Sequence, residues 1–184
     1  MLTNTPVTPF GITCIYPQIP GIPPYHNNGI WPFVQAFWTL AGASDKNMDA
    51  VEAGLASIIR PAALFLTNKE NFVAETGDFA GTEVNSDRQL WSVAGMLAMY
   101  HRVLTGISFS KDGMEFNPVI PKSFGGNYRL DNFRYRNGTY SITVSGWGDA
   151  ISSFSIDGVR SDGNLIPTEM TGNHTVEIVM NKKA

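Results

Sequence analysis

The hydrophobic period of this chain changes once, at Gly106, and that change limits the folds that the chain can adopt. Before Gly106 the apolar residues recur every three or four positions, which is the spacing of an amphipathic helix. After Gly106 they alternate with polar residues, which is the spacing of a strand with one buried face. The pattern predicts an α+β protein with a helical part, residues 1–105, followed by a β part, residues 106–184.

The helical part begins with a proline-rich arm and continues with three helices. Seven of the 11 prolines fall within the first 32 residues, and each removes a backbone donor, so residues 1–29 are expected to be extended. Ser44 or Asp45 should cap the second helix, and Gly106 should stop the third. The first two helices are expected over residues 29–40 and 46–66, and the third from Ser86 or Asp87 to Leu104.

The first of these helices is apolar on nearly every face. Such a helix must be buried on most sides, but two other helices and an extended arm offer too few partners. Either the chain forms a homo-oligomer, or it is the C-terminal piece of a larger domain. Trp38 and Trp91 lie within apolar patterns and are expected in the core, whereas His101 is expected on the helix surface.

The β part is predicted to contain short strands joined by tight turns. Glycine follows Asn137, Asp157 and Asp162, and these pairs are typical of hairpin turns. Short strands with turn signals at this spacing favour an antiparallel β-sandwich. The expected strands are Met114–Phe116, Tyr128–Tyr135, Tyr140–Ser145, Ile151–Ile156 and Thr175–Met180.

Composition excludes several classes of protein. The net charge of −3 argues against a nucleic-acid partner. No stretch approaches the roughly 18 apolar residues of a membrane span, so no membrane partner is expected. Cys14 is the only cysteine, which rules out intrachain disulfides and cysteine-based zinc sites. His26, His101 and His174 fall in different elements, so no metal site is expected.

Two segments concentrate the residues that could carry chemistry. Residues 25–33 place polar and aromatic side chains at a helix start, where free N–H groups face outward. Residues 68–78 form a loop that holds Glu70, Glu75 and Asp78. Aromatic rings can contact the C–H faces of a sugar, and carboxylates its hydroxyls. Two carboxyl groups can hydrolyse a glycosidic bond, so the segments favour a carbohydrate ligand.

The residues alone leave the roles of these side chains open. Thr76-Gly77-Asp78 is typical of a turn, so Glu75 and Asp78 can be explained as turn residues. Glu70 can be a solvated loop carboxylate or a catalytic one. Trp31 can be a core residue or a sugar platform, and His26 can cap the helix or line a binding site.

Three stretches in order resemble the six-hairpin, (α/α)6-barrel glycosidases of glycoside hydrolase family 63 and the trehalases. YHNNGIWPFVQAFWTLAGA is similar to the family's YHNGGxWP segment. ENFVAETGDFAG and QLWSVAGMLAMYHRVL are similar to its E-Y-Y-x-P-x-T-G … F-x-W-[ST]-A-A pattern. Asn71 stands where the family often has tyrosine, and Ala74 where it often has proline. The resemblance implies the last helices of a partial barrel followed by a β-sandwich.

The resemblance also implies an activity and the residues that perform it. Glu70 corresponds to the general base of an inverting hydrolysis, and Tyr25, His26, Asn28 and Trp31 would line the sugar subsite. The family's general acid lies upstream of the matched region, so this chain is expected to be nearly inactive alone. No cofactor is implied, and the sugar would be an α-linked gluco- or manno-configured glycoside.

Two other classes of function remain open. The chain could be a free-standing carbohydrate-binding or structural module, or one part of a split enzyme that another chain completes. The first eleven residues, MLTNTPVTPFG, lack Lys, Arg and an apolar run, so no signal peptide is expected. The resemblance nevertheless points to a periplasmic or secreted parent, and the compartment of the chain stays unknown.

Overall fold

The computed structural model describes residues 7–181, and the prediction of an α+β protein is confirmed. The chain divides into two compact units, Met1–Met99 and Tyr100–Ala184. Part of the stretch that argues against a signal peptide, residues 1–6, lies outside the described residues. No barrel or six-hairpin arrangement is evident among residues 7–181.

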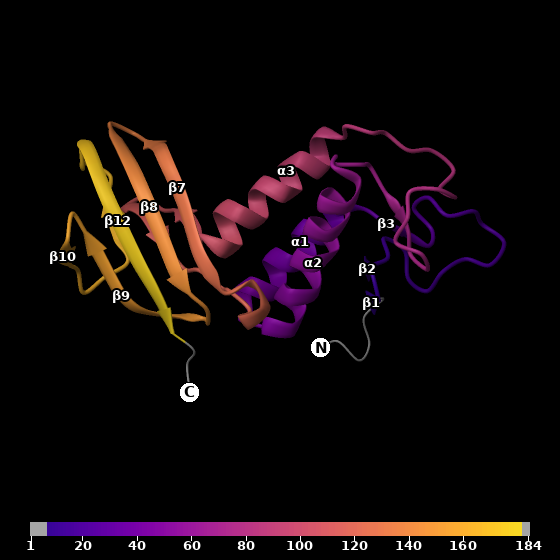
Figure 1. Cartoon of the computed structure of the whole chain (residues 1–184), viewed down its shortest axis with the longest axis horizontal. Helices are drawn as coiled ribbons and strands as arrows, with labels where there is room; N and C mark the ends of the chain where they lie inside the picture. The colour runs from indigo at the N-terminus through magenta and orange to yellow at the C-terminus, as the bar shows by residue number, and fades with distance from the viewer. Residues whose placement is uncertain (1–6, 182–184) are drawn as a thin grey trace. The chain divides into compact units, whose positions relative to one another are not determined.

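Three α-helices form the main body of the first unit: α1 (Pro32–Ser44), α2 (Met48–Phe65) and α3 (Leu90–Ala98). α1 packs against both of the others, and Figure 1 shows α1 and α2 side by side. The predicted caps of α2 are wrong, because Asn47 is the N-cap and its side chain accepts a hydrogen bond from the Ala50 N–H at 3.1 Å. After α3 the helix widens into a π-helical segment, η2 (Met99–Leu104).

The described part of the proline-rich arm is only partly extended, because turns and bends separate its three very short strands: β1 (Val7–Thr8), β2 (Gly11–Ile12) and β3 (Gly29–Ile30). β1 pairs with β2, whereas β3 pairs with β4 (Phe72–Val73) of the loop between α2 and α3. The fully buried Gln35 of α1 fixes the arm. Its side chain accepts a hydrogen bond from the Ile12 N–H at 2.8 Å and donates one to the Ile12 carbonyl at 2.9 Å.

The second unit contains most of η2, from Tyr100 on, and two sheets. The smaller sheet has the order β11–β6–β5 and is antiparallel, and the larger has the order β10–β9–β12–β8–β7 (Figure 1). Every predicted strand is present, whereas β5, β10 and β11 were not predicted. The strands are β5 (Ile107–Phe109), β6 (Gly113–Phe116), β7 (Gly126–Tyr135), β8 (Gly138–Gly146), β9 (Ala150–Ile156), β10 (Val159–Arg160), β11 (Leu165–Pro167) and β12 (Gly172–Asn181).

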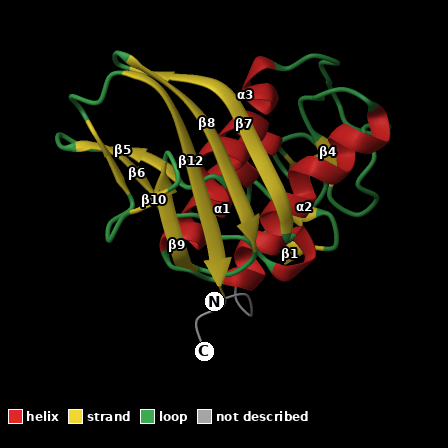
Figure 2. Cartoon of the chain, turned by 60° about the vertical axis from the view of Figure 1, so that its left-hand side comes forward, coloured by secondary structure: helices red, strands yellow, loops and turns green. Residues whose placement is uncertain are grey.

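The expectation of an entirely antiparallel sandwich is wrong, because β12 runs parallel to β8. The last strand inserts between β8 and β9 rather than joining an edge. Val176, Ile178 and Met180 are buried at alternate positions of β12. In its central position β12 has a neighbouring strand along each of its two edges. β5 and β6 lie on one side of the larger sheet (Figure 2), and the rings of Phe116 and Phe154 are 5.6 Å apart.

A bulge in β7 sets the register of its pairing with β8. Leu130 pairs with Ile142 and Phe133 with Tyr140, so β7 carries one extra residue between them. Asn132, within this bulge, has a φ of 57°. The bulge returns Phe133 to the inner face of the sheet, which a regular strand would not do.

The prediction that Trp91 belongs to the core is wrong, because 57% of its surface is exposed. Its ring packs edge-on against Phe33 of α1 at 5.2 Å. Phe37, Leu90 and Leu97 are also exposed, each by more than half. α1 and α3 therefore present an apolar surface, here called the α1/α3 face and defined by Phe37, Leu90, Trp91 and Leu97.

Candidate functional site

The pairing of β3 with β4 brings together the two segments that sequence analysis singled out. Gly29 pairs with Val73 and Ile30 with Phe72, and the Ala74 N–H donates to the Asn28 carbonyl at 3.0 Å. All five predicted site residues therefore lie in one cluster of the first unit. We call it the Tyr25–Glu70 cluster and define it by Tyr25, His26, Asn28, Trp31, Glu70 and Glu75.

Tyr25 and Glu70 are in direct contact, although 45 positions separate them in the sequence. The Tyr25 hydroxyl donates to Glu70 Oε1 at 3.4 Å, and both side chains are half-buried. The pKa of Tyr25 is raised, first by desolvation and then by the neighbouring Glu70 carboxylate. Tyr25 therefore remains a neutral donor at ordinary pH, and the bond holds one oxygen of Glu70 in place.

Trp31 is buried within this cluster, so its indole ring is not an exposed platform for a sugar. Only 3% of Trp31 is exposed, and its indole N–H donates to the Tyr25 carbonyl at 2.9 Å. The exposed His26 ring stacks on the indole with centroids 4.7 Å apart and planes 10° apart. Because His26 covers an indole face, a sugar would meet His26 and Tyr25 before it met Trp31.

Asn28 and Glu75 form a second polar pair in the same cluster, in which the Asn28 amide donates to Glu75 Oε1. The sequence favours a turn residue at Glu75. The turn is present, since the Gly77 N–H donates to the Val73 carbonyl at 2.8 Å. Glu75 therefore has its backbone in a turn and its side chain against a predicted binding residue.

Gly29 is required for the close folding of the first segment on itself. A Cβ atom at this position would lie 1.7 Å from the Tyr25 carbonyl oxygen. That carbonyl accepts the Trp31 indole N–H, so the same approach that excludes a side chain at Gly29 fixes Tyr25 above Trp31. Glycine here allows the backbone to turn back beneath the aromatic group.

The loop that carries Glu70 is held by buried polar side chains that sequence analysis missed. Lys69 is 7% exposed and forms an ion pair with Asp87, and its ammonium lies 3.7 Å from the centroid of the Phe79 ring. The Lys69 ammonium also donates a hydrogen bond to the Asp87 carboxylate, and this bond is the main reason that the pKa of Asp87 is lowered. Asn71, fully buried, donates to the Val84 carbonyl at 3.0 Å. The backbone on both sides of Glu70 is therefore fixed.

Asn27 fixes the backbone of the other segment, residues 25–33, in a similar way. Its side chain accepts from the Ile19 N–H at 2.7 Å and donates to the carbonyls of Ile19 and Ile22 at 3.2 and 3.1 Å. Asparagine can satisfy backbone groups of a loop in this way, and a proline-rich stretch followed by asparagine is the only sequence signal for it. Asn27 is thus a structural residue between two predicted binding residues.

Other kinds of chemistry find little support in residues 7–181. No group of three or more His, Cys, Asp and Glu side chains there could hold a metal ion. Burial raises the pKa of the Cys14 thiol to about 11, so it is protonated near neutral pH and is a poor nucleophile. In the same part of the chain, no helix has both the length and the apolar character that crossing a membrane requires.

The Tyr25–Glu70 cluster can therefore offer a sugar an oriented carboxylate, an amide–carboxylate pair and two aromatic side chains at the surface. The resemblance to the six-hairpin glycosidases rests on the quoted stretches alone. Comparison with known proteins finds no matching family model and no matching curated protein.

Proposed function

We propose that this chain is the C-terminal part of an inverting glycoside hydrolase of the six-hairpin class, with Glu70 as the general base. The observation that carries the proposal is the contact between Tyr25 and Glu70, which β3 and β4 bring about. In this proposal α1–α3 are the last helices of an (α/α)6 barrel, and the second unit is the β-sandwich that follows it.

Each residue of the cluster has a distinct role in this reaction. Glu70 takes a proton from a water molecule on the face of the sugar opposite the leaving group. Tyr25 holds the Glu70 carboxylate through its hydroxyl, and Asn28 and His26 contact the sugar. Trp31, which is buried under His26, is a positioning residue for Tyr25.

The general acid must come from outside the residues of this cluster. Acid catalysis by a positioned side chain typically contributes about 10²–10⁴-fold to the rate. We therefore expect the chain to hydrolyse ordinary glycosides very slowly. The α1/α3 face supports this view, since large exposed apolar surfaces usually bind a partner. Preceding helices of a longer protein, or a second chain of a split enzyme, would cover it.

A second candidate function is carbohydrate binding without catalysis. His26 is exposed beside the half-buried Tyr25, and the Asn28–Glu75 pair lies within the same cluster. These groups can bind hydroxyls and the C–H face of a sugar even if no bond is broken. In that case Glu70 would only accept a hydrogen bond from Tyr25 or from the ligand.

Glycosyl fluorides test the proposal with the chain as it exists. Fluoride departs without protonation, so a site with a base and no acid can still hydrolyse these substrates. We expect the wild-type chain to release fluoride from α-glucosyl or α-mannosyl fluoride faster than buffer does, as measured with a fluoride electrode. Saturable binding of the sugar without release would favour the binding module. If the chain neither binds the sugar nor releases fluoride, both functions are contradicted.

A further inference from the structure

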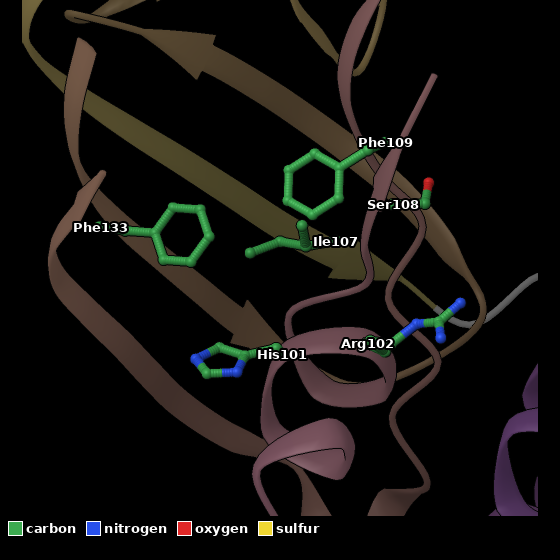
Figure 3. Close-up of a pocket in the computed structure, with 6 residues that line it drawn as sticks. All are labelled: His101, Arg102, Ile107, Ser108, Phe109 and Phe133. Carbon is green, nitrogen blue, oxygen red and sulfur yellow. The ribbon is translucent and has the colours of Figure 1, made fainter. Parts of the chain in front are cut away.

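A separate cavity lies in the second unit, far in sequence from the Tyr25–Glu70 cluster. Its volume is about 560 Å³, within the range of roughly 300–1,000 Å³ that is usual for small-molecule sites. η2, β5 and β7 supply its walls. The lining residues are His101, Arg102, Ile107, Ser108, Phe109 and Phe133 (Figure 3).

Two phenyl rings form the apolar wall of this cavity. Figure 3 shows Phe109 and Phe133 pointing toward one another, with Ile107 between them. Phe109 is 61% exposed, and its other support is Tyr135, whose ring stacks on it at 5.3 Å and 21°. The bulge in β7 keeps Phe133 on the same face of the strand as Leu130. A ring face left exposed in this way, as on Phe109, can pack against a flat apolar group.

The polar groups of the cavity are cationic or neutral, and none of the six lining residues is acidic. Arg102 is exposed and, among residues 7–181, forms no ion pair. A second guanidinium, that of Arg136, lies 5.7 Å from the Tyr135 ring. Asp131, two positions before Phe133 on β7, forms an ion pair with Arg129 at 2.9 Å. Arginine matches a carboxylate with its planar array of donors.

We propose that this cavity binds a small organic anion with a flat apolar body. The body packs against Phe109, Ile107 and Phe133, and the anionic group pairs with Arg102. Ser108 and His101 are the only other polar side chains among the lining residues, so the many hydroxyls of a sugar would be left unpaired. The proposed ligand therefore differs in class from that of the Tyr25–Glu70 cluster, and the inference does not depend on the function proposed for that cluster.

The test uses 2-naphthoate as the probe and its neutral isostere, 2-naphthamide, as the comparison. Each is titrated into the full chain while the backbone amide signals of Ile107, Phe109 and Phe133 are followed by NMR. We expect these signals to move saturably with 2-naphthoate, with a dissociation constant on the order of 1 mM or below, as suits a ligand of this size. The neutral probe should bind roughly fivefold more weakly.

Two variants locate the charge that the probe recognises. Arg102→Gln should weaken 2-naphthoate roughly fivefold and leave 2-naphthamide unchanged. The control is Arg134→Gln, because Arg134 is adjacent to Phe133 on β7 and therefore lies on its opposite face. It should leave both probes unchanged, and Phe109→Ala should weaken both.

The proposal is overturned if the amides of the cavity show no saturable shift up to about 10 mM of either probe. It is also overturned if the acid and the amide bind equally well, or if Arg102→Gln and Arg134→Gln have the same effect on 2-naphthoate. Unchanged amide spectra outside the cavity in the Arg102→Gln variant would establish that the variant is folded.

Discussion

The two units bury their apolar residues to different degrees. In the second unit, β8 and β12 place apolar side chains on one face of the larger sheet, and those of Tyr140, Ile142, Val176 and Ile178 are almost fully buried. In the first unit, α1 and α3 leave the α1/α3 face exposed. A strand with period two has one apolar face, which one layer can cover. A helix that is apolar all round needs partners on several sides.

The largest effect on stability is expected at the buried face of the larger sheet in the second unit. Ile178 is 1% exposed, and Ile178→Ala should lower the free energy of unfolding of this unit by about 2–5 kcal/mol through lost burial and a cavity. Val179, its neighbour on β12, is 42% exposed, so Val179→Ala should cost less than about 0.5 kcal/mol. Urea unfolding measures both. Equal losses would mean that the inner face of this sheet is not a packed core.

A smaller effect is expected where polar bonds join the arm to the first unit. Gln35→Leu puts an apolar side chain of similar size in place of the amide and leaves the N–H and carbonyl of Ile12 without their partner. Buried unpaired groups of this kind cost about 1–3 kcal/mol. The thermal unfolding midpoint should fall, and the arm should be cut faster by protease. Gln18→Ala is the control, because the hydrogen bonds that the Gln18 side-chain amide donates lie in a more exposed loop. No change in cleavage for Gln35→Leu would contradict the role of Gln35.

The exposed helices predict association rather than instability. The wild-type chain should form a dimer or a larger species at micromolar concentration, as measured by light scattering. Replacing both Phe37 and Trp91 by serine should give a monomer near 20.1 kDa, with stability changed by less than about 1 kcal/mol. A monomeric wild-type chain that unfolds cooperatively would show that the first unit needs no partner.

The smallest effect concerns an ion pair at the edge of the second unit. Asp157 lies 2.7 Å from His174 Nδ1, and the His174 ring also bonds the Thr171 carbonyl at 2.9 Å. The bond to Asp157 is the main cause that raises the pKa of His174, and the same bond lowers that of Asp157. The contribution of His174 is present below its ordinary pKa of 6.5 and is lost as the pH rises through the raised value. That of Asp157 is present above 3.8 and is lost as the pH falls through the lowered value.

The pair therefore stabilises the unit most between pH 3.8 and 6.5. His174→Asn should lower the unfolding midpoint by about 2 °C at pH 5, because the pair is partly exposed, and by less at pH 8. Thermal unfolding followed by circular dichroism at both pH values measures this. A difference between variant and wild type that stays constant from pH 5 to pH 8 would exclude protonation of His174 as its source.

Much of the fold could be predicted from local patterns. Strands β6, β7, β8, β9 and β12 follow the alternation of apolar residues, and the Asp157-Gly158 turn joins Ile156 to its partner Val159. The position of β12 between β8 and β9 could not be predicted, because strand order depends on contacts across the whole unit. The bulge at Asn132 and the very short strands β5, β10 and β11 leave no periodic signal.

The residues of the candidate site could be predicted from the sequence, but the hydrogen bonds that hold them in place could not. The chemistry of residues 25–31 and 70–75 identified both segments, and the β3–β4 pairing joins them. The bonds that hold the site come from Lys69, Asn71 and Asn27, which are buried polar residues. Burial of a polar side chain depends on its tertiary partners, so no periodicity reveals it. For the same reason His26 was not expected to stack on Trp31.

The central claim is that Glu70 acts as a base and that Glu75 does not. Each is changed to glutamine, which keeps the size and removes the basic oxygen, and fluoride release from an α-glycosyl fluoride is measured with equal amounts of folded protein. We predict that Glu70→Gln lowers the rate by about 10²-fold or more with little change in KM, while Glu75→Gln stays within about threefold of wild type. Loss of release in Glu75→Gln with full release in Glu70→Gln would contradict the account.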